Sequence, residues 1–216
     1  MKTDRFPTAI QQILVARRKK RITHALSKVT TKPNMKIIDI GCGIDGRSFE
    51  NFIPLNWEVI GVDLQDPKKI NHTHPNFQYY QQDAKDLNQF TDKQFDLAVS
   101  IGLLEHVTEK KIFKQTTSEI RRVAKQHIVI VPAKYCWIEP HYGFPFFPLY
   151  PYSIQKFLIK LFNLSNHREP IKKDPEFIKK HVMWPSNREY KRTFPESKIY
   201  LTPNLDQIAI IKKDLL

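Results

Sequence analysis

A glycine-rich turn between two apolar runs is the feature of this sequence best suited to bind a ligand. Gly41, Gly43 and Gly46 follow the apolar run 36–40 in a G-x-G-x-x-G pattern, and Asp63 ends the next apolar run. Glycines let the backbone approach a ligand closely, and an acid at the end of the second strand can bind ribose hydroxyls. The spacing therefore predicts a site for a cofactor that contains a nucleoside.

Two acids near this turn favour a positively charged cofactor. Asp39 precedes the turn and Asp45 lies within it. A dinucleotide would place its pyrophosphate at the turn, where these carboxylates would repel it. S-adenosylmethionine has no phosphate and carries a sulfonium and an ammonium group, so nearby carboxylates suit it better.

Two histidines are candidates for proton transfer. His106 follows the apolar run 95–100, and His141 lies in an aromatic segment after the run 128–131. Both positions fall at the carboxyl edge of a parallel sheet, where such sheets bind ligands. A hydroxyl acceptor would need a base with a pKa near neutrality, which is most often a histidine. The alternative for His106 is a structural residue that hydrogen-bonds the backbone.

No metal site is predicted. His72 and His74 form a His-x-His pair, but no cysteine or cluster of acids lies near them in the sequence. Structural zinc sites need a fuller ligand set than this pair. Cys42 is explained as a small residue in the glycine-rich turn.

Alternating strand-like and helix-like segments must position these residues. They predict an α/β, Rossmann-like fold with a parallel sheet and helices on both faces. The expected strands are 36–40, 57–62, 76–80, 95–100, 128–131, 198–202 and 207–212, and the expected helices are 9–29, 112–123 and 153–164. Residues 165–195 are basic and rich in proline, which predicts a loop with one short helix, and a turn is expected at 203–204.

Composition and charge exclude several classes of protein. The 216 residues include 14 Phe, 8 Tyr and 3 Trp, which is too much aromatic mass for a disordered chain. No apolar run is long enough for a transmembrane segment, and two cysteines cannot form a disulfide framework. We therefore expect a cytoplasmic protein, with peripheral attachment to a membrane as an alternative.

The formal net charge of +13 is concentrated at the two ends of the chain. Residues 1–35 carry +8 and residues 151–216 carry +6, whereas residues 36–150 carry −1. We divide this single domain into a basic N-terminal helix (1–34), a cofactor-binding core (35–134), a substrate-facing insert (135–196) and terminal strands that complete the sheet (197–216). The basic flanks would suit an anionic surface or an anionic acceptor.

Four motifs in register resemble class I S-adenosylmethionine-dependent methyltransferases. They are DIGCGIDG, the acid in VIGVDL, the acid in QQDAKDL, and FDLAVSIGLLEHV, which together span about residues 33–135. The last motif resembles the small-molecule, type 11-like branch of that family. The resemblance implies a mostly parallel seven-stranded sheet with an antiparallel last strand, and S-adenosylmethionine as the cofactor. The loop departs from the usual pattern, because one extra residue precedes Gly46.

The resemblance also implies a role for each matching residue. Asp39, Gly41 and Gly43 would form the turn under the methionine part of the cofactor, and Asp63 would bind the ribose. Leu64 would pack on the adenine, with Asp83 and Ala84 at its edge. The full expected set is Asp39, Ile40, Gly41, Cys42, Gly43, Asp63, Leu64, Asp83, Ala84, Ser100, Ile101 and Gly102.

The aromatic segment after the fifth expected strand is the candidate acceptor region. The phrase WIEPHYGFPF is similar to a segment of some bacterial and archaeal methyltransferases associated with glycan or lipid-linked substrates. We expect Trp137, Glu139, Tyr142 and Phe146 to contact the substrate, with His141 and then His106 as catalytic candidates. The alternative is that this segment forms a second small core.

The leading prediction is methyl transfer from S-adenosylmethionine to a small molecule, at an oxygen of a glycan, a lipid-linked group or an aromatic hydroxyl. A nucleic-acid methyltransferase that uses the basic flanks is an alternative. It is disfavoured because Ser100-Ile101-Gly102-Leu103 is not the Asn/Asp-Pro-Pro-aromatic sequence typical of enzymes that methylate base amino groups. A basic binding module without catalysis is a further alternative.

Overall fold

The carboxyl edge of a seven-stranded sheet carries the predicted site in the computed structural model, which describes residues 8–45, 49–139, 141–203 and 207–213. The strands are β1 (Lys36–Ile40), β2 (Glu58–Asp63), β3 (Phe77–Gln81), β4 (Phe95–Ile101), β5 (Ala124–Pro132), β6 (Lys198–Leu201) and β7 (Gln207–Lys212). Their order is β3-β2-β1-β4-β5-β7-β6. The first five strands are parallel, and β7 runs antiparallel to both of its neighbours. This topology confirms the predicted fold class.

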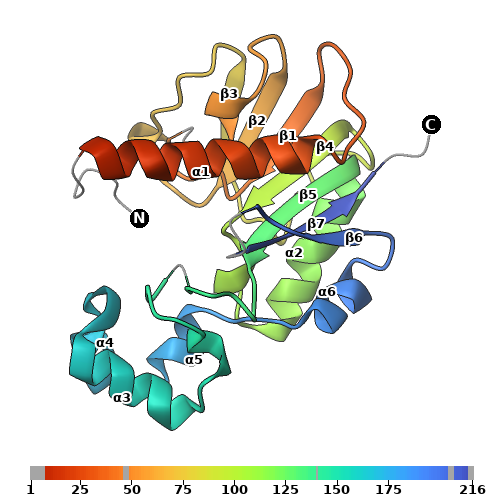
Figure 1. Cartoon of the computed structure of the whole chain (residues 1–216). Helices are drawn as coiled ribbons and strands as arrows, with labels where there is room; N and C mark the ends of the chain where they lie inside the picture. The colour runs from red at the N-terminus through yellow and green to blue at the C-terminus, as the bar shows by residue number, and fades with distance from the viewer. Residues whose placement is uncertain (1–7, 46–48, 140, 204–206, 214–216) are drawn as a thin grey trace.

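Helices cover both faces of the sheet (Figure 1). The helices are α1 (Thr8–Leu26), α2 (Lys110–Val123), α3 (Tyr152–Phe162), α4 (Arg168–Lys173), α5 (Phe177–His181) and α6 (Asn187–Thr193). Ile22 and Ala25 of α1 belong to the core on one face, and Ile120 of α2 and Tyr190 of α6 belong to the core on the other. The central strands are apolar on both faces, as parallel strands between two layers of helices must be.

The crossovers are less helical than the alternating pattern predicts. The described residues between β1 and β2 include a 3-10 turn at Glu50–Phe52, and those between β2 and β3 include one at Pro67–Lys69. Between β4 and β5 the crossover is a full helix, α2. Gly46, the last glycine of the G-x-G-x-x-G pattern, lies outside the described residues, and so does Asn204 of the turn expected at 203–204.

Strand β5 begins earlier than predicted because three polar residues conceal its start. It starts at Ala124, directly after α2, and pairs with Phe95 there. Gln126 hides the strand pattern, yet its amide hydrogen-bonds both backbone groups of Thr30, at 2.8 and 2.9 Å. A buried polar side chain whose hydrogen bonds are made in this way can lie in an otherwise apolar strand.

Side chains between Tyr142 and Trp184 build a third core beside the sheet. The helices of this region correct the prediction for residues 165–195. Instead of a loop with one short helix, that segment contains α4, α5 and α6. Ile171 and Ile178 pack with Phe147 and Ile159 in the third core. Helices of 5 to 7 residues are too short to show the periodicity on which the prediction depends. Figure 1 shows α3, α4 and α5 together as a lobe below the carboxyl edge.

None of the helices within the described residues is long and apolar enough to cross a membrane.

The buried imidazole of His127 on β5 predicts a pH-dependent stability. Burial lowers the pKa of His127 to about 3, so the ring stays neutral in the fold, where it contacts Ser197 Oγ at 2.6 Å. In an unfolded chain the pKa of a histidine is about 6.5. At pH values between the two pKa values, His127 binds a proton in the unfolded chain but not in the folded chain. The free energy of unfolding must therefore fall with falling pH, by at most about 1.4 kcal/mol per pH unit from this residue. Urea unfolding of wild type and His127→Gln across this range should show a shallower slope in the variant. Equal slopes would contradict the assignment.

Candidate active site

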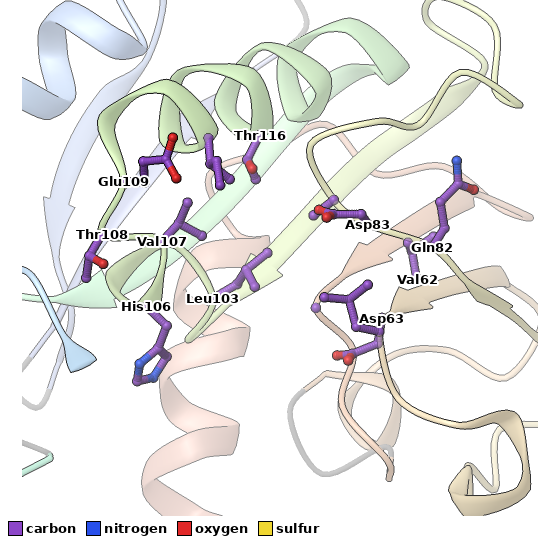
Figure 2. Close-up of a pocket in the computed structure, with 14 residues that line it drawn as sticks. Val62, Asp63, Gln82, Asp83, Leu103, His106, Val107, Thr108, Glu109 and Thr116 are labelled. Carbon is purple, nitrogen blue, oxygen red and sulfur yellow. The ribbon is translucent and has the colours of Figure 1, made fainter. Parts of the chain in front are cut away.

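A cavity of about 340 Å³ lies at the carboxyl edge of the sheet. Figure 2 shows Asp63 and Asp83 on one wall and Leu103, Val107 and Thr116 on the facing wall. Five of the predicted cofactor residues line it, namely Gly41, Asp63, Leu64, Asp83 and Ala84. His106, a predicted catalytic candidate, lines it too. The structure thus brings together residues from the loops after β1, β2, β3 and β4.

The other predicted cofactor residues lie outside the lining of this cavity. They are Asp39, Ile40, Cys42, Gly43, Ser100, Ile101 and Gly102. Asp39, Ile40, Cys42 and Ser100 are almost fully buried, and Ser100 Oγ has no hydrogen-bond partner within the described part of the chain. Of these four buried residues, Asp39 and Ile40 end β1, Cys42 lies in the turn and Ser100 lies near the end of β4.

The glycine-rich turn is held by hydrogen bonds to β2, two of which are donated by its glycines. Gly41 N donates to Val62 O at 2.7 Å, and Gly43 N donates to Asp63 Oδ2 at 2.9 Å. Gly41 has φ +79° and Gly43 has φ +73°. A Cβ at Gly43 would meet no described atom within 4 Å, so the backbone there is open for a ligand to approach.

Gly41→Ala should destabilise the fold. The added Cβ would require a left-handed conformation and would lie 3.0 Å from Leu103 Cβ, on the cavity wall. We expect a loss of about 1–3 kcal/mol in urea unfolding. Gly143→Ala is the matched control, because Gly143 has φ +62° and a Cβ there meets no described atom within 4 Å. Equal losses in the two variants would show that contact with Leu103 adds nothing.

Asp39 lies beneath the turn, next to a second buried acid. Burial raises the pKa of Asp39 well above its usual range, and the nearby carboxyl of Glu50 raises it further. His72 Nδ1 lies 3.3 Å from Glu50 Oε1 on the other side. Asp39 thus acts on the turn from below, outside the lining of the cavity.

Asp63 and Leu64 have the geometry expected for binding a nucleoside. Asp63 Oδ1 accepts from Gln65 N at 3.2 Å, so each carboxylate oxygen accepts one backbone bond. A carboxylate offers about four lone-pair sites, which leaves two for a diol. The side chain of Leu64 is 65% exposed beside this carboxylate and offers an apolar surface to a base.

Asp83 lies on the same wall of the cavity, where its carboxylate can accept a hydrogen bond. Its Oδ2 pairs with Lys85 Nζ at 2.9 Å. Burial acts to raise the pKa of Asp83, but the hydrogen bonds and charge of Lys85 outweigh it, so the pKa lies below its ordinary value. The carboxyl group is therefore ionised near neutral pH and can accept from an exocyclic amine.

His141 is held by Glu139 in the insert. His141 Nδ1 lies 2.7 Å from Glu139 Oε1, and Glu139 Oε2 accepts from the backbone of His141 and Tyr142, each at 2.7 Å. Trp184 Nε1 donates to Glu139 Oε1 at 3.2 Å. Burial acts to lower the pKa of His141, but the hydrogen bond and charge of Glu139 raise it above its ordinary value. The ring is therefore basic and fixed in orientation.

Glu105 and His106 bring two more titratable groups to His141. They lie in a 3-10 turn, Leu104–His106, directly after β4. His141 Nε2 lies 4.0 Å from Glu105 Oε1, and the rings of His141 and His106 meet edge to face with centroids 5.0 Å apart. Burial raises the pKa of Glu105 to about 7, although His141 and Arg21 oppose the shift. His106 and His141, predicted separately, thus lie together at the cavity.

The four predicted substrate residues divide into two groups. Trp137 and Phe146 are partly exposed and meet edge to face, with ring centroids 5.1 Å apart. Glu139 is fully buried and positions His141, and Tyr142 stacks on Phe147 in the third core. An acceptor outside the fold can therefore reach only the first pair directly.

Residues around the two candidate histidines escaped the sequence prediction, as did several that line the cavity: Val62, Gln82, Leu103, Val107, Thr108, Glu109, Ile112 and Thr116. Glu105 directly precedes His106 in the sequence, and this adjacency is the signal that could have indicated it as a site residue. His181 O accepts from His106 Nδ1 at 2.8 Å, and Trp184 contacts Glu139. These two lie in and after α5, and only the folded third core brings them to the site.

Comparison with known proteins identifies the fold around this cavity. Residues 38–131 match a family model described as a methyltransferase domain. This part of the chain, from β1 to β5, is therefore similar to a methyltransferase domain. The match ends at Val131, so the aromatic insert lies beyond it. None of the curated proteins compared with the chain matches it.

Solved structures with the same fold include several methyltransferases at low sequence identity. A SAM-dependent methyltransferase from Methanosarcina mazei is 16% identical, with a TM-score of 0.52, covering 86% of this chain and 95% of that one. A SAM-dependent methyltransferase from Aquifex aeolicus is 13% identical, with a TM-score of 0.52, covering 96% and 98%. The CurJ carbon methyltransferase is 13% identical, with a TM-score of 0.56, covering 97% of this chain and 56% of that one. At these identities the likeness shows the fold alone.

The residues of the cavity fit S-adenosylmethionine. The two free lone-pair sites of Asp63 match a ribose diol, and the exposed Leu64 matches the face of an adenine. The open backbone at Gly43 leaves room for close approach of the amino-acid part. Asp83 faces the same cavity and offers an acceptor for the adenine amine.

Proposed function

We propose that this methyltransferase transfers the methyl group of S-adenosylmethionine to an oxygen of a small molecule. The observation that carries the proposal is the pairing of His141 with Glu139, in which His141 Nδ1 lies 2.7 Å from Glu139 Oε1. The ring of His141 also contacts the ring of His106, which lines the cavity. A histidine oriented by a carboxylate is suited to take a proton from a hydroxyl group. A methyl transfer to carbon, as named for CurJ, would not need such a base for every acceptor.

On the cofactor side, the residues of the chain bind the cofactor and orient it. The bound cofactor supplies an electrophilic methyl group on its sulfonium. Asp63 holds the ribose, Leu64 and Asp83 hold the adenine, and the turn at Gly41 and Gly43 holds the amino-acid part. Alignment of two reactants in this way can contribute up to about 7–11 kcal/mol.

On the acceptor side, His141 Nε2 takes the proton of the hydroxyl group. Glu139 keeps the ring in the tautomer that leaves Nε2 unprotonated, because Glu139 Oε1 accepts from Nδ1. Trp137 and Phe146 offer an exposed aromatic surface, on which a sugar or an aromatic ring could stack. The acceptor is therefore a hydroxylated molecule with a flat or apolar part.

The basic flanks fit an acceptor or a surface that carries negative charge. Lys19 and Lys20 of α1 are exposed, and the lobe around α3 carries further lysines. Long-range attraction of this kind speeds association and weakens with salt. RNA remains the alternative anionic acceptor, and it enters the screen below for that reason.

A screen with labelled cofactor tests the proposal. Calorimetry with S-adenosylmethionine first establishes that the folded protein binds the cofactor. Methyl transfer is then measured with hydroxylated aromatics, sugars, lipid-linked glycans and RNA, and carbon-13 NMR of the product identifies the methylated atom. We expect an O-methyl product from a small molecule. A product methylated at carbon, or in RNA alone, would contradict the proposal.

A further inference from the structure

Three side chains beside the cavity, one of which lines it, bring ligand atoms together. One side-chain atom each from Glu105, His106 and His141 can be chosen so that all lie within 4.8 Å of one another. Glu105 and His106 come from the turn after β4, and His141 comes from the insert. His106 also lines the cavity, so the cluster adjoins the site proposed for the cofactor.

The hydrogen bonds behind the two imidazoles fix which nitrogen faces the cluster. His106 Nδ1 lies 2.8 Å from the backbone oxygen of His181, which can only accept, so Nδ1 carries the hydrogen. Glu139 Oε1 accepts from His141 Nδ1 in the same way, at 2.7 Å. Each neutral ring therefore keeps a lone pair on Nε2. An imidazole held at one nitrogen by a carboxylate or a carbonyl is the arrangement found around metal-binding histidines.

Glu105 completes a set of three acceptors. The residue is 2% exposed, and its Oε2 is buried without a hydrogen-bond partner in the described part of the chain. Its Oε1 lies 4.0 Å from His141 Nε2, which is too far for a hydrogen bond. A cation bound between Glu105 Oε1 and the lone pair of His141 Nε2 would neutralise this buried carboxylate.

We propose that Glu105, His106 and His141 bind a divalent transition-metal ion, whose open coordination positions take the acceptor oxygen. Two histidines and one carboxylate are the protein ligands of several catalytic zinc and iron sites. Bonds of about 2.0–2.2 Å place tetrahedral ligand atoms about 3.3–3.5 Å apart. The three ligand atoms, which all lie within 4.8 Å of one another, would therefore have to move closer by about 1 Å.

The role of the ion rests on the proposed function and changes one assignment within it. With the ion bound, His141 is a ligand and no longer takes the proton. The ion lowers the pKa of the bound hydroxyl group, and its proton passes to water. Two imidazole nitrogens favour Zn²⁺, Fe²⁺ or Co²⁺ over Mg²⁺, which prefers oxygen ligands.

Cobalt binding tests the site without any acceptor. The full chain, without a histidine tag, is stripped with a chelator and titrated with Co²⁺ near neutral pH, while the visible absorption of bound Co²⁺ is recorded. We expect one ion per chain, no competition from Mg²⁺, and a Kd raised by at least about 100-fold in His106→Ala and His141→Ala. Glu139→Gln, which weakens the hydrogen bond behind His141, should raise the Kd by about 10–100-fold. His24→Gln, on α1 outside the cluster, should bind as the wild type does.

Two results would overturn the proposal. One is a folded, chelator-treated protein that takes up no Co²⁺ at about 100 μM, with folding checked by circular dichroism. The other is Co²⁺ binding of equal affinity in wild type and His141→Ala. Since Co²⁺ uptake needs neither cofactor nor acceptor, these results are separate from a failure to methylate oxygen. Once an acceptor is known, an undiminished rate in the stripped enzyme would remove the ion from the reaction.

Discussion

His141→Ala should lower kcat by about 10²–10⁴-fold while leaving the Kd for S-adenosylmethionine within about twofold of wild type. That range is the usual contribution of a positioned base, and loss of a metal ligand would act on the same step. The cofactor affinity should hold because His141 lies outside the lining of the cofactor cavity. Turnover is measured with the acceptor found in the labelled screen, and affinity by calorimetry.

The controls separate chemistry from folding. His24→Gln removes an imidazole from α1 and should leave both kcat and cofactor affinity unchanged. Urea unfolding of His141→Ala should confirm that the insert keeps its core, since Tyr142 and Phe147 still stack there. A variant that turns over as fast as wild type would show that His141 neither takes the proton nor binds a metal ion that the reaction needs.

The sheet could be predicted because its strands are short apolar runs followed by glycine or acid residues. Strands β1 and β2 were predicted almost to the residue, since Asp39 is the single polar residue between their end residues. The start of β5 could not be, because Gln126 and His127 look polar in the sequence and find their partners only in the fold, in Thr30 and Ser197. Local pattern therefore fails where distant residues satisfy a buried polar group.

The two halves of the site differ in the same way. The wall proposed for the cofactor follows strand ends in chain order, so spacing indicated Asp63 and the glycines, and the resemblance to methyltransferases added Asp83. The acceptor side depends on the third core, which carries His181 O and Trp184 Nε1 to His106 and Glu139. No metal site was predicted because its proposed ligands come from separate segments, without the close spacing of a motif.

Asp63→Ala should raise the Kd for S-adenosylmethionine by about 10–100-fold. The variant loses the hydrogen bonds of the carboxylate to the ribose, which are worth about 1–3 kcal/mol in total. It also releases Gly43 N, which the carboxylate holds at 2.9 Å, so the turn loses part of its order. Calorimetry on folded protein measures the change.

Two further variants separate the contributions to this loss of cofactor affinity. Asp66→Ala removes a carboxylate that lies three residues further on and accepts from Lys68 N at 2.9 Å, and it should leave cofactor affinity unchanged. Asp63→Asn keeps one oxygen acceptor for the turn but has no charge and only half the lone-pair sites. Its Kd should lie between those of wild type and Asp63→Ala, because a neutral amide makes weaker bonds to hydroxyl groups than a carboxylate does. An Asp63→Ala variant that binds with wild-type affinity would place the ribose elsewhere in the cavity.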